Sequence, residues 1–132
     1  MKYLPQKIIT LIGLSMLTLT AAADQTLNAT EIKDLFGGNT VTAFSEIKKA
    51  PVRLYYDTNG EVRGLFSSGK IGKTKWWVKD SGVICLKSLK GDMCFEVVAK
   101  NNQYLKYLIK GDGQRMLAFS METFSPGNMN QY

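Results

Sequence analysis

Few residue types in this chain can carry acid–base or nucleophilic chemistry. The 132 residues include no histidine, which excludes the Ser-His-Asp and Cys-His arrangements of common hydrolases. Two carboxylate pairs remain, Asp57 with Glu61 and Asp92 with Glu96, and both flank predicted turns, where acidic residues are common for structural reasons. Two cysteines without histidine do not complete a zinc site, and Gly-Asp-Gly at 111–113 is too short for a phosphate or calcium loop. The sequence therefore predicts a non-enzymatic protein without catalytic residue, cofactor or metal.

The two cysteines, Cys85 and Cys94, have a spacing that favours a disulfide. The residues between them form a predicted hairpin turn centred between Leu89 and Lys90, so that both cysteines lie equally far from the turn. They then face each other across two antiparallel strands, where Cα atoms approach to about 4.5 Å. Closing so short a loop contributes roughly 2–3 kcal/mol of stability. A redox-active pair is disfavoured because the spacing is not that of a C-x-x-C motif.

The N-terminus has the pattern of a secretory signal peptide. Lys2 and Lys7 supply positive charge, an apolar run follows at 8–19, and small alanines end it at 21–23. Cleavage is predicted after Ala23, because small residues at this place suit a signal peptidase. The apolar run is also shorter than the about 20 residues that a membrane span needs. An uncleaved signal that serves as a membrane anchor is the alternative. The predicted mature chain, residues 24–132, is one domain of periplasmic or secreted location.

Composition says little about the partner of this mature chain. Its 15 basic and 11 acidic residues leave a net charge near +4, and no later segment resembles a transmembrane span. The basic residues are scattered and the chain is predicted to be exported, so nucleic acid is not an expected partner. A solvated surface explains this charge, and an anionic envelope partner is the alternative. Ligand, protein partner and oligomeric state remain open from sequence.

One helix and about eight strands must position any site. Asn28 and Glu31 form a predicted capping box for a short helix that ends at Gly37-Gly38. Beyond it, turn residues such as Asn59-Gly60 separate short strand candidates. These candidates span residues 40–44, 52–56, 61–66, 73–79, 83–86, 93–99, 103–110 and 115–120. The prediction is an all-β, antiparallel meander that closes into a small up-and-down, lipocalin-like barrel, with a two-sheet sandwich or an open half-barrel as the alternative. The tail from 121 is expected to lie across one end.

Alternation along the strands assigns their faces. In 73–79, Trp76 is expected inside, whereas Trp77 stands outside among lysines, namely Lys73, Lys75 and Lys79. That outer group is a candidate contact for a ligand or partner; the alternative is a tryptophan lying on the barrel wall under lysine stems. Inward positions on other strands are predicted for Val52, Leu54, Tyr56, Leu117 and Phe119. The strand at 103–110 is apolar on both faces, one carrying Leu105, Tyr107 and Ile109 and the other Tyr104, Lys106 and Leu108.

Several segments match a known pattern. They are Leu-Phe-Gly-Gly-Asn-Thr at 35–40, Tyr-Tyr-Asp-Thr-Asn-Gly-Glu-Val-Arg-Gly at 55–64, Trp-Val-Lys-Asp-Ser-Gly-Val-Ile-Cys-Leu at 77–86, Met-Cys-Phe-Glu-Val at 93–97 and Gly127-Asn128. On these segments the chain resembles a family of small exported proteobacterial proteins known only as a domain of unknown function. The resemblance covers nearly all of the mature chain and implies that Trp77 is the tryptophan that precedes the first cysteine. It implies no activity and no site residues.

Two functions follow as predictions. The first is a periplasmic or secreted β-barrel that binds a small apolar or amphipathic ligand, which requires an internal cavity lined by apolar side chains. The alternative is a protein-interaction module, an inhibitor or a secreted effector, that uses the aromatic and basic surface around Trp77. Aromatic residues are numerous enough to fill a small barrel completely, so the sequence does not decide whether a cavity exists.

Overall fold

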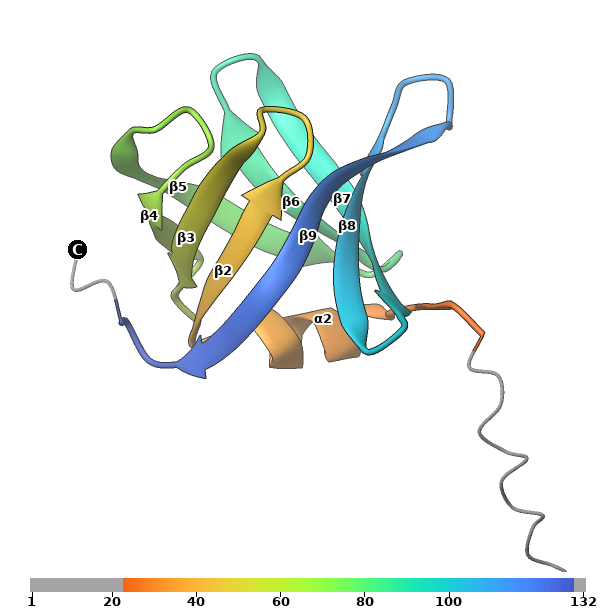
Figure 1. The fold of residues 1–132 in the computed structure, drawn as a ribbon, viewed down its shortest axis with the longest axis horizontal. Helices are drawn as coiled ribbons and strands as arrows, with labels where there is room; N and C mark the ends of the chain where they lie inside the picture. Colours follow the sequence, from red (N-terminus) through yellow and green to blue (C-terminus); the bar gives the residue numbers. More distant parts are fainter. Residues whose placement is uncertain (1–22, 130–132) are drawn as a thin grey trace, which may run out of the picture.

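The protein forms a closed antiparallel barrel, shown by a computed structural model that describes residues 23–129 (Figure 1). Its elements are β1 (Gln25–Thr26), α2 (Ala29–Phe36), β2 (Asn39–Ser45), β3 (Ala50–Tyr56), β4 (Glu61–Leu65), β5 (Ile71–Lys79), β6 (Val83–Ser88), β7 (Gly91–Lys100), β8 (Gln103–Ile109) and β9 (Arg115–Pro126). From β2 onward each strand pairs with the next, and β9 pairs back with β2. The predicted up-and-down barrel is confirmed, and the sandwich and half-barrel alternatives are excluded.

The N-terminal segment closes one end of this barrel. β1 pairs with Val98 and Ala99 of β7, and the chain then enters α2, which lies across the barrel end (Figure 1). The predicted capping box is present, because the Asn28 side chain accepts from the Glu31 amide at 2.8 Å and Glu31 accepts from the Asn28 amide at 2.9 Å. Ile32 and Phe36 are fully buried, so one face of the helix plugs the barrel. The predicted signal peptide, apart from Ala23, lies outside the described residues.

The β6–β7 hairpin has the predicted register. Its turn is Leu89-Lys90, and Cys85 lies directly opposite Cys94. Their sulfurs are bonded and their Cα atoms are 4.0 Å apart. The predicted disulfide is therefore confirmed as a bridge between neighbouring strands.

The last strand differs from the prediction. Residues 121–126 do not form a tail across one end but continue β9, which pairs with β2 as far as Pro126. The register shifts twice, so that Ala118 and Glu122 have no pairing partner and each reverses the alternation of faces. Leu117, predicted inside, consequently lies opposite the outward Tyr107, and Ala118 is buried in the core instead.

Candidate ligand site inside the barrel

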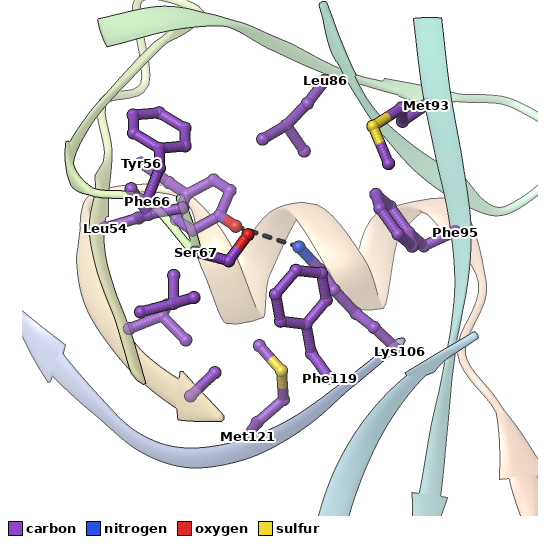
Figure 2. A pocket seen from close by; sticks show the side chains of 13 residues that line it. Leu54, Tyr56, Phe66, Ser67, Leu86, Met93, Phe95, Lys106, Phe119 and Met121 are labelled. Carbon is purple, nitrogen blue, oxygen red and sulfur yellow. Dashed lines mark hydrogen bonds between the residues drawn. The ribbon is translucent and has the colours of Figure 1, made fainter. Parts of the chain in front are cut away.

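The inner faces of the strands leave a partly filled interior. Val52, Leu54 and Tyr56 of β3 are buried there as predicted, and Phe119 of β9 packs against the same core. Between them lies a cavity of about 120 Å³ (Figure 2). Its lining consists of Val41, Ala43, Val52, Leu54, Tyr56, Phe66, Ser67, Leu86, Met93, Phe95, Lys106, Phe119 and Met121. The aromatic side chains therefore do not fill the barrel completely.

Lys106 is the one charged residue in this lining. It comes from β8, on the face that also carries Tyr104 and Leu108, and only 3% of its surface is exposed. Its Nζ donates a hydrogen bond of 2.9 Å to the hydroxyl of Tyr56, which approaches from β3 on the other side of the barrel (Figure 2). The pair places one amine and one phenol together in an otherwise mainly apolar space.

Aromatic rings surround the Lys106 amine. Nζ lies 5.1 Å from the ring centroids of Phe36 and Phe95, 5.3 Å from that of Tyr56 and 5.5 Å from that of Phe119. These distances are within the range of cation–π attraction. Among the described residues, no ion pair includes Lys106. The amine thus has rings and one hydroxyl around it but no carboxylate.

Burial controls the protonation of both groups. Desolvation lowers the pKa of the Lys106 ammonium to about 7, because the charged form loses its hydration. The same cause raises the pKa of the Tyr56 phenol above its usual value. Near neutral pH the site therefore offers a neutral hydroxyl and an amine poised between its two charge states.

The cavity has a floor and a mouth. Phe36 of α2 and the Lys106–Tyr56 pair mark the floor, since α2 closes that end of the barrel (Figures 1 and 2). Among the lining residues, Met93 is exposed and Phe66 and Ser67 are partly exposed. Ser67 belongs to the β4–β5 turn and Met93 to the start of β7, at the end away from α2. A molecule entering there would pass Ser67 and Met93 at the mouth and then the apolar walls before it reached the polar pair.

The predicted contact group lies elsewhere, on the outer face of β5. Trp76 is buried in the core and donates a hydrogen bond of 2.8 Å from its indole Nε1 to the Asp57 carbonyl, which leaves Trp77 on the opposite face. There Trp77 lies opposite Cys85, which in turn is bonded to Cys94, so tryptophan and disulfide form one row on the outer wall. Trp77 is only partly exposed.

The three lysines of that contact group, Lys73, Lys75 and Lys79, are exposed on the same strand. The Nζ of Lys73 lies 3.8 Å from the Oε2 of Glu61 on the neighbouring strand β4. The structure therefore brings Trp77 and these lysines to one side of β5 but not to the cavity.

The carboxylate pairs stay outside the cavity as well. Both carboxylates form ion pairs with Arg63 of β4: Asp57 from the β3–β4 turn, and Glu61 from the same strand. Glu96 pairs with Arg115 at 2.8 Å, whereas Asp92 is exposed on β7. Both members of the first pair, and Glu96 of the second, are thus engaged in structural ion pairs on the barrel wall.

Comparisons with known protein families, with curated proteins and with solved structures give no match for this chain. The resemblance drawn from the sequence therefore stays a prediction. Within residues 23–129, no helix is long and apolar enough to cross a membrane.

The sequence analysis did not single out Lys106. Its signal was present: a lysine in a strand that is apolar on both faces, on the same side as an aromatic and an aliphatic residue two positions away. One face of such a strand points into the barrel, but both faces are apolar, so the apolar neighbours of Lys106 do not tell whether it points inward. The pattern did not show which face is inside, and the Lys106–Tyr56 pair needs contact across the barrel.

Proposed function

We propose that this protein is a non-enzymatic binding protein that holds a small amphipathic molecule inside its barrel. The observation that carries the proposal is the cavity itself, in which a mainly apolar lining surrounds the buried amine of Lys106 and the buried phenol of Tyr56. Binding sites for small molecules commonly combine such an apolar wall with a few placed polar groups. The apolar part of the ligand is expected against Leu54, Leu86 and Met121.

The size of the cavity limits the ligand. An apolar cavity of roughly 150 Å³ in another protein binds benzene, so 120 Å³ suits about six non-hydrogen atoms. Short chains or a single ring fit this space, and a longer chain would extend through the mouth beside Met93. Large lipids or multi-ring compounds are not expected to enter fully.

We further propose that the chain is exported and works in the periplasm or outside the cell. The Cys85–Cys94 bridge supports this, because disulfides persist in oxidising compartments. Protein recovered from its host is expected to begin at Asp24 and to resist alkylation of both cysteines before reduction. Retention of residues 1–23, or free reaction of both thiols in the unreduced, denatured protein, would contradict export.

Binding can be tested by NMR titration of the mature protein with toluene and hexan-1-ol. Saturable shifts are expected for methyl groups that line the cavity, such as those of Leu54 and Met121. Ala43→Leu adds carbon atoms at a buried lining position and should weaken binding at least tenfold without unfolding the protein. Lys87→Met, an exposed change next to Leu86, is the control and should bind as the wild type does. Absence of saturable shifts in the wild type, or equal binding by Ala43→Leu, would refute the proposal.

A further inference from the structure

We infer that the ligand is a small organic carboxylate whose charged end is bound by the Lys106 ammonium and the Tyr56 hydroxyl at the cavity floor. Its apolar part would point toward the mouth. This inference rests on the proposed function and adds the chemical class of the ligand. It comes from three features of the floor: an amine without a counter-ion, unused hydrogen-bond donors, and the absence of any other charge in the lining.

The missing counter-ion is the first feature. A buried ammonium normally requires an opposite charge and hydrogen bonds to offset its desolvation. Lys106 has the Tyr56 hydroxyl and the rings of Phe36, Phe95 and Phe119 around it, and the ion pairs of the described residues do not include it. A ligand with one negative charge supplies that counter-ion. A cationic ligand would be repelled, and a dianion would bring one charge more than the site can balance.

The hydrogen-bond inventory points to the same group. An ammonium has three N–H donors, and Lys106 uses one of them toward Tyr56. The hydroxyl of Tyr56 accepts that bond, and no group within residues 23–129 accepts its own proton. Two oxygens of a carboxylate can accept from both groups at once. An alcohol or an amide oxygen is a weaker acceptor without charge and leaves the ammonium unneutralised.

The surroundings of Lys106 make this binding dependent on pH. Tyr56 is the other titratable side chain of the lining, and it remains neutral because burial raises its pKa. No charged residue of the elements packed around Lys106 lines the cavity. On β7 and β9, Glu96 pairs with Arg115, and the others are exposed, namely Asp92, Lys100 and Glu122. On α2, Glu31 caps the helix, and the exposed charged residues of α2 and β3 are Lys33, Asp34 and Arg53. Lys106 is therefore the group that titrates when the ligand binds.

The direction and size of the effect follow from that group. With a pKa of about 7, the protonated fraction of Lys106 in the free protein falls from about nine-tenths at pH 6 to about 3% at pH 8.5. A carboxylic acid, with a pKa of about 4–5, is ionised throughout this range. Because the carboxylate binds the ammonium form, the apparent Kd should rise about thirtyfold from pH 6 to pH 8.5, with uptake of a proton at the higher pH.

Hexanoate and hexan-1-ol are the probes that test the inference, since they share a chain and differ in charge. The mature protein with its disulfide intact is titrated with each, by NMR or calorimetry, at pH 6, 7.5 and 8.5. Hexanoate should bind at least tenfold more tightly than hexan-1-ol at pH 6 and weaken about thirtyfold by pH 8.5. The Kd of hexan-1-ol should change less than threefold.

Variants assign the effect to the floor. Lys106→Met should lose the preference for hexanoate and its pH dependence while it still binds hexan-1-ol, whereas exposed Lys87→Met should retain both. Tyr56→Phe keeps the ring, so it tests the hydroxyl alone; we expect hexanoate binding to weaken about fivefold to tenfold. This second variant and the pH series decide the matter even if Lys106→Met does not fold.

The outcomes separate the two proposals. Binding of hexan-1-ol without preference for hexanoate at pH 6 would overturn the carboxylate inference and leave the proposed function intact. Failure of both probes and of toluene to bind would overturn the proposed function together with the inference. Preference for hexanoate that survives in Lys106→Met would show that another cation binds the carboxylate, and would also overturn the inference.

Discussion

Replacement of Lys106 by methionine should stabilise the fold below neutral pH. The pKa of this buried amine is lowered from 10.5 to about 7, and one pKa unit corresponds to about 1.4 kcal/mol, so burial disfavours the charged form by roughly 5 kcal/mol. Methionine has a similar length, carries no charge and suits an irregular apolar space. It leaves the hydroxyl of Tyr56 without its partner, at a cost of about 1–3 kcal/mol. The net gain in free energy of unfolding at pH 6 is then about 2–4 kcal/mol.

The pH dependence of this difference has a defined sign. Because the pKa of Lys106 is lower in the folded state, the unfolded chain binds more protons between pH 7 and 10.5. Stability of the wild type therefore rises with pH across that window, and the full penalty is present below it. From pH 6 to pH 9 the wild type should gain roughly 3 kcal/mol relative to Lys106→Met. The advantage of the variant should thus shrink to near zero or reverse.

Urea unfolding of both proteins at pH 6, 7.5 and 9, with the disulfide intact, measures this difference. Exposed Lys87→Met serves as the control and should follow the wild type within about 0.5 kcal/mol at each pH. The rings of Phe36, Phe95 and Phe119 around Lys106 attract its charged form and so act against desolvation. Equal differences between wild type and Lys106→Met at all three pH values would mean that the rings compensate burial fully, and would refute the reasoning.

Three further changes test the frame of the barrel. Replacing both Cys85 and Cys94 by alanine should lower the free energy of unfolding by about 3 kcal/mol in chemical denaturation, and an equally stable variant would show that the bridge does not constrain the unfolded chain. Gly82→Ala should cost about 1–2 kcal/mol, since Gly82 has φ of +91° and an added Cβ would lie 3.4 Å from the Leu27 carbonyl oxygen; Gly72→Ala, in open space, is the matched control and should cost less than 0.5 kcal/mol. Asn28→Ala removes the helix cap and should lower the thermal midpoint by an amount corresponding to about 1 kcal/mol, with no change expected if water replaces the cap fully.

Local chemistry made much of this fold predictable. The Asn59-Gly60 turn, the capping box at Asn28 and the hairpin between Cys85 and Cys94 each depend on residues a few positions apart. Their geometry follows from turn and capping preferences that act within one segment. The order of eight short strands with short connections then leaves a meander as the natural arrangement, and closure removes its edges.

The last strand and the cavity floor depend on contacts that local patterns do not carry. β9 continues to Pro126 because β2 offers it a partner far away in the chain, and its unpaired Ala118 and Glu122 change faces without any glycine or proline to signal them. Lys106 approaches Tyr56 across 50 positions of sequence. A strand that is apolar on both faces gives no preference for the face that turns inward, so a single lysine there is easily taken for a surface residue.

The position of Lys106 indicates that this residue serves ligand binding rather than the stability of the fold. A small barrel gains stability from apolar contacts, and a methionine or leucine at this place would supply more of them without desolvation of an amine. The lysine instead lowers stability near and below neutral pH and lies at the floor of a cavity that opens beside Met93. Groups that weaken a fold while they point into a cavity are characteristic of binding sites, where stability is lost in exchange for interaction with a ligand. An anion that neutralises Lys106 would offset this penalty, so the stabilisation that ligand binding adds should grow as pH falls toward 6, while the free protein itself becomes less stable there.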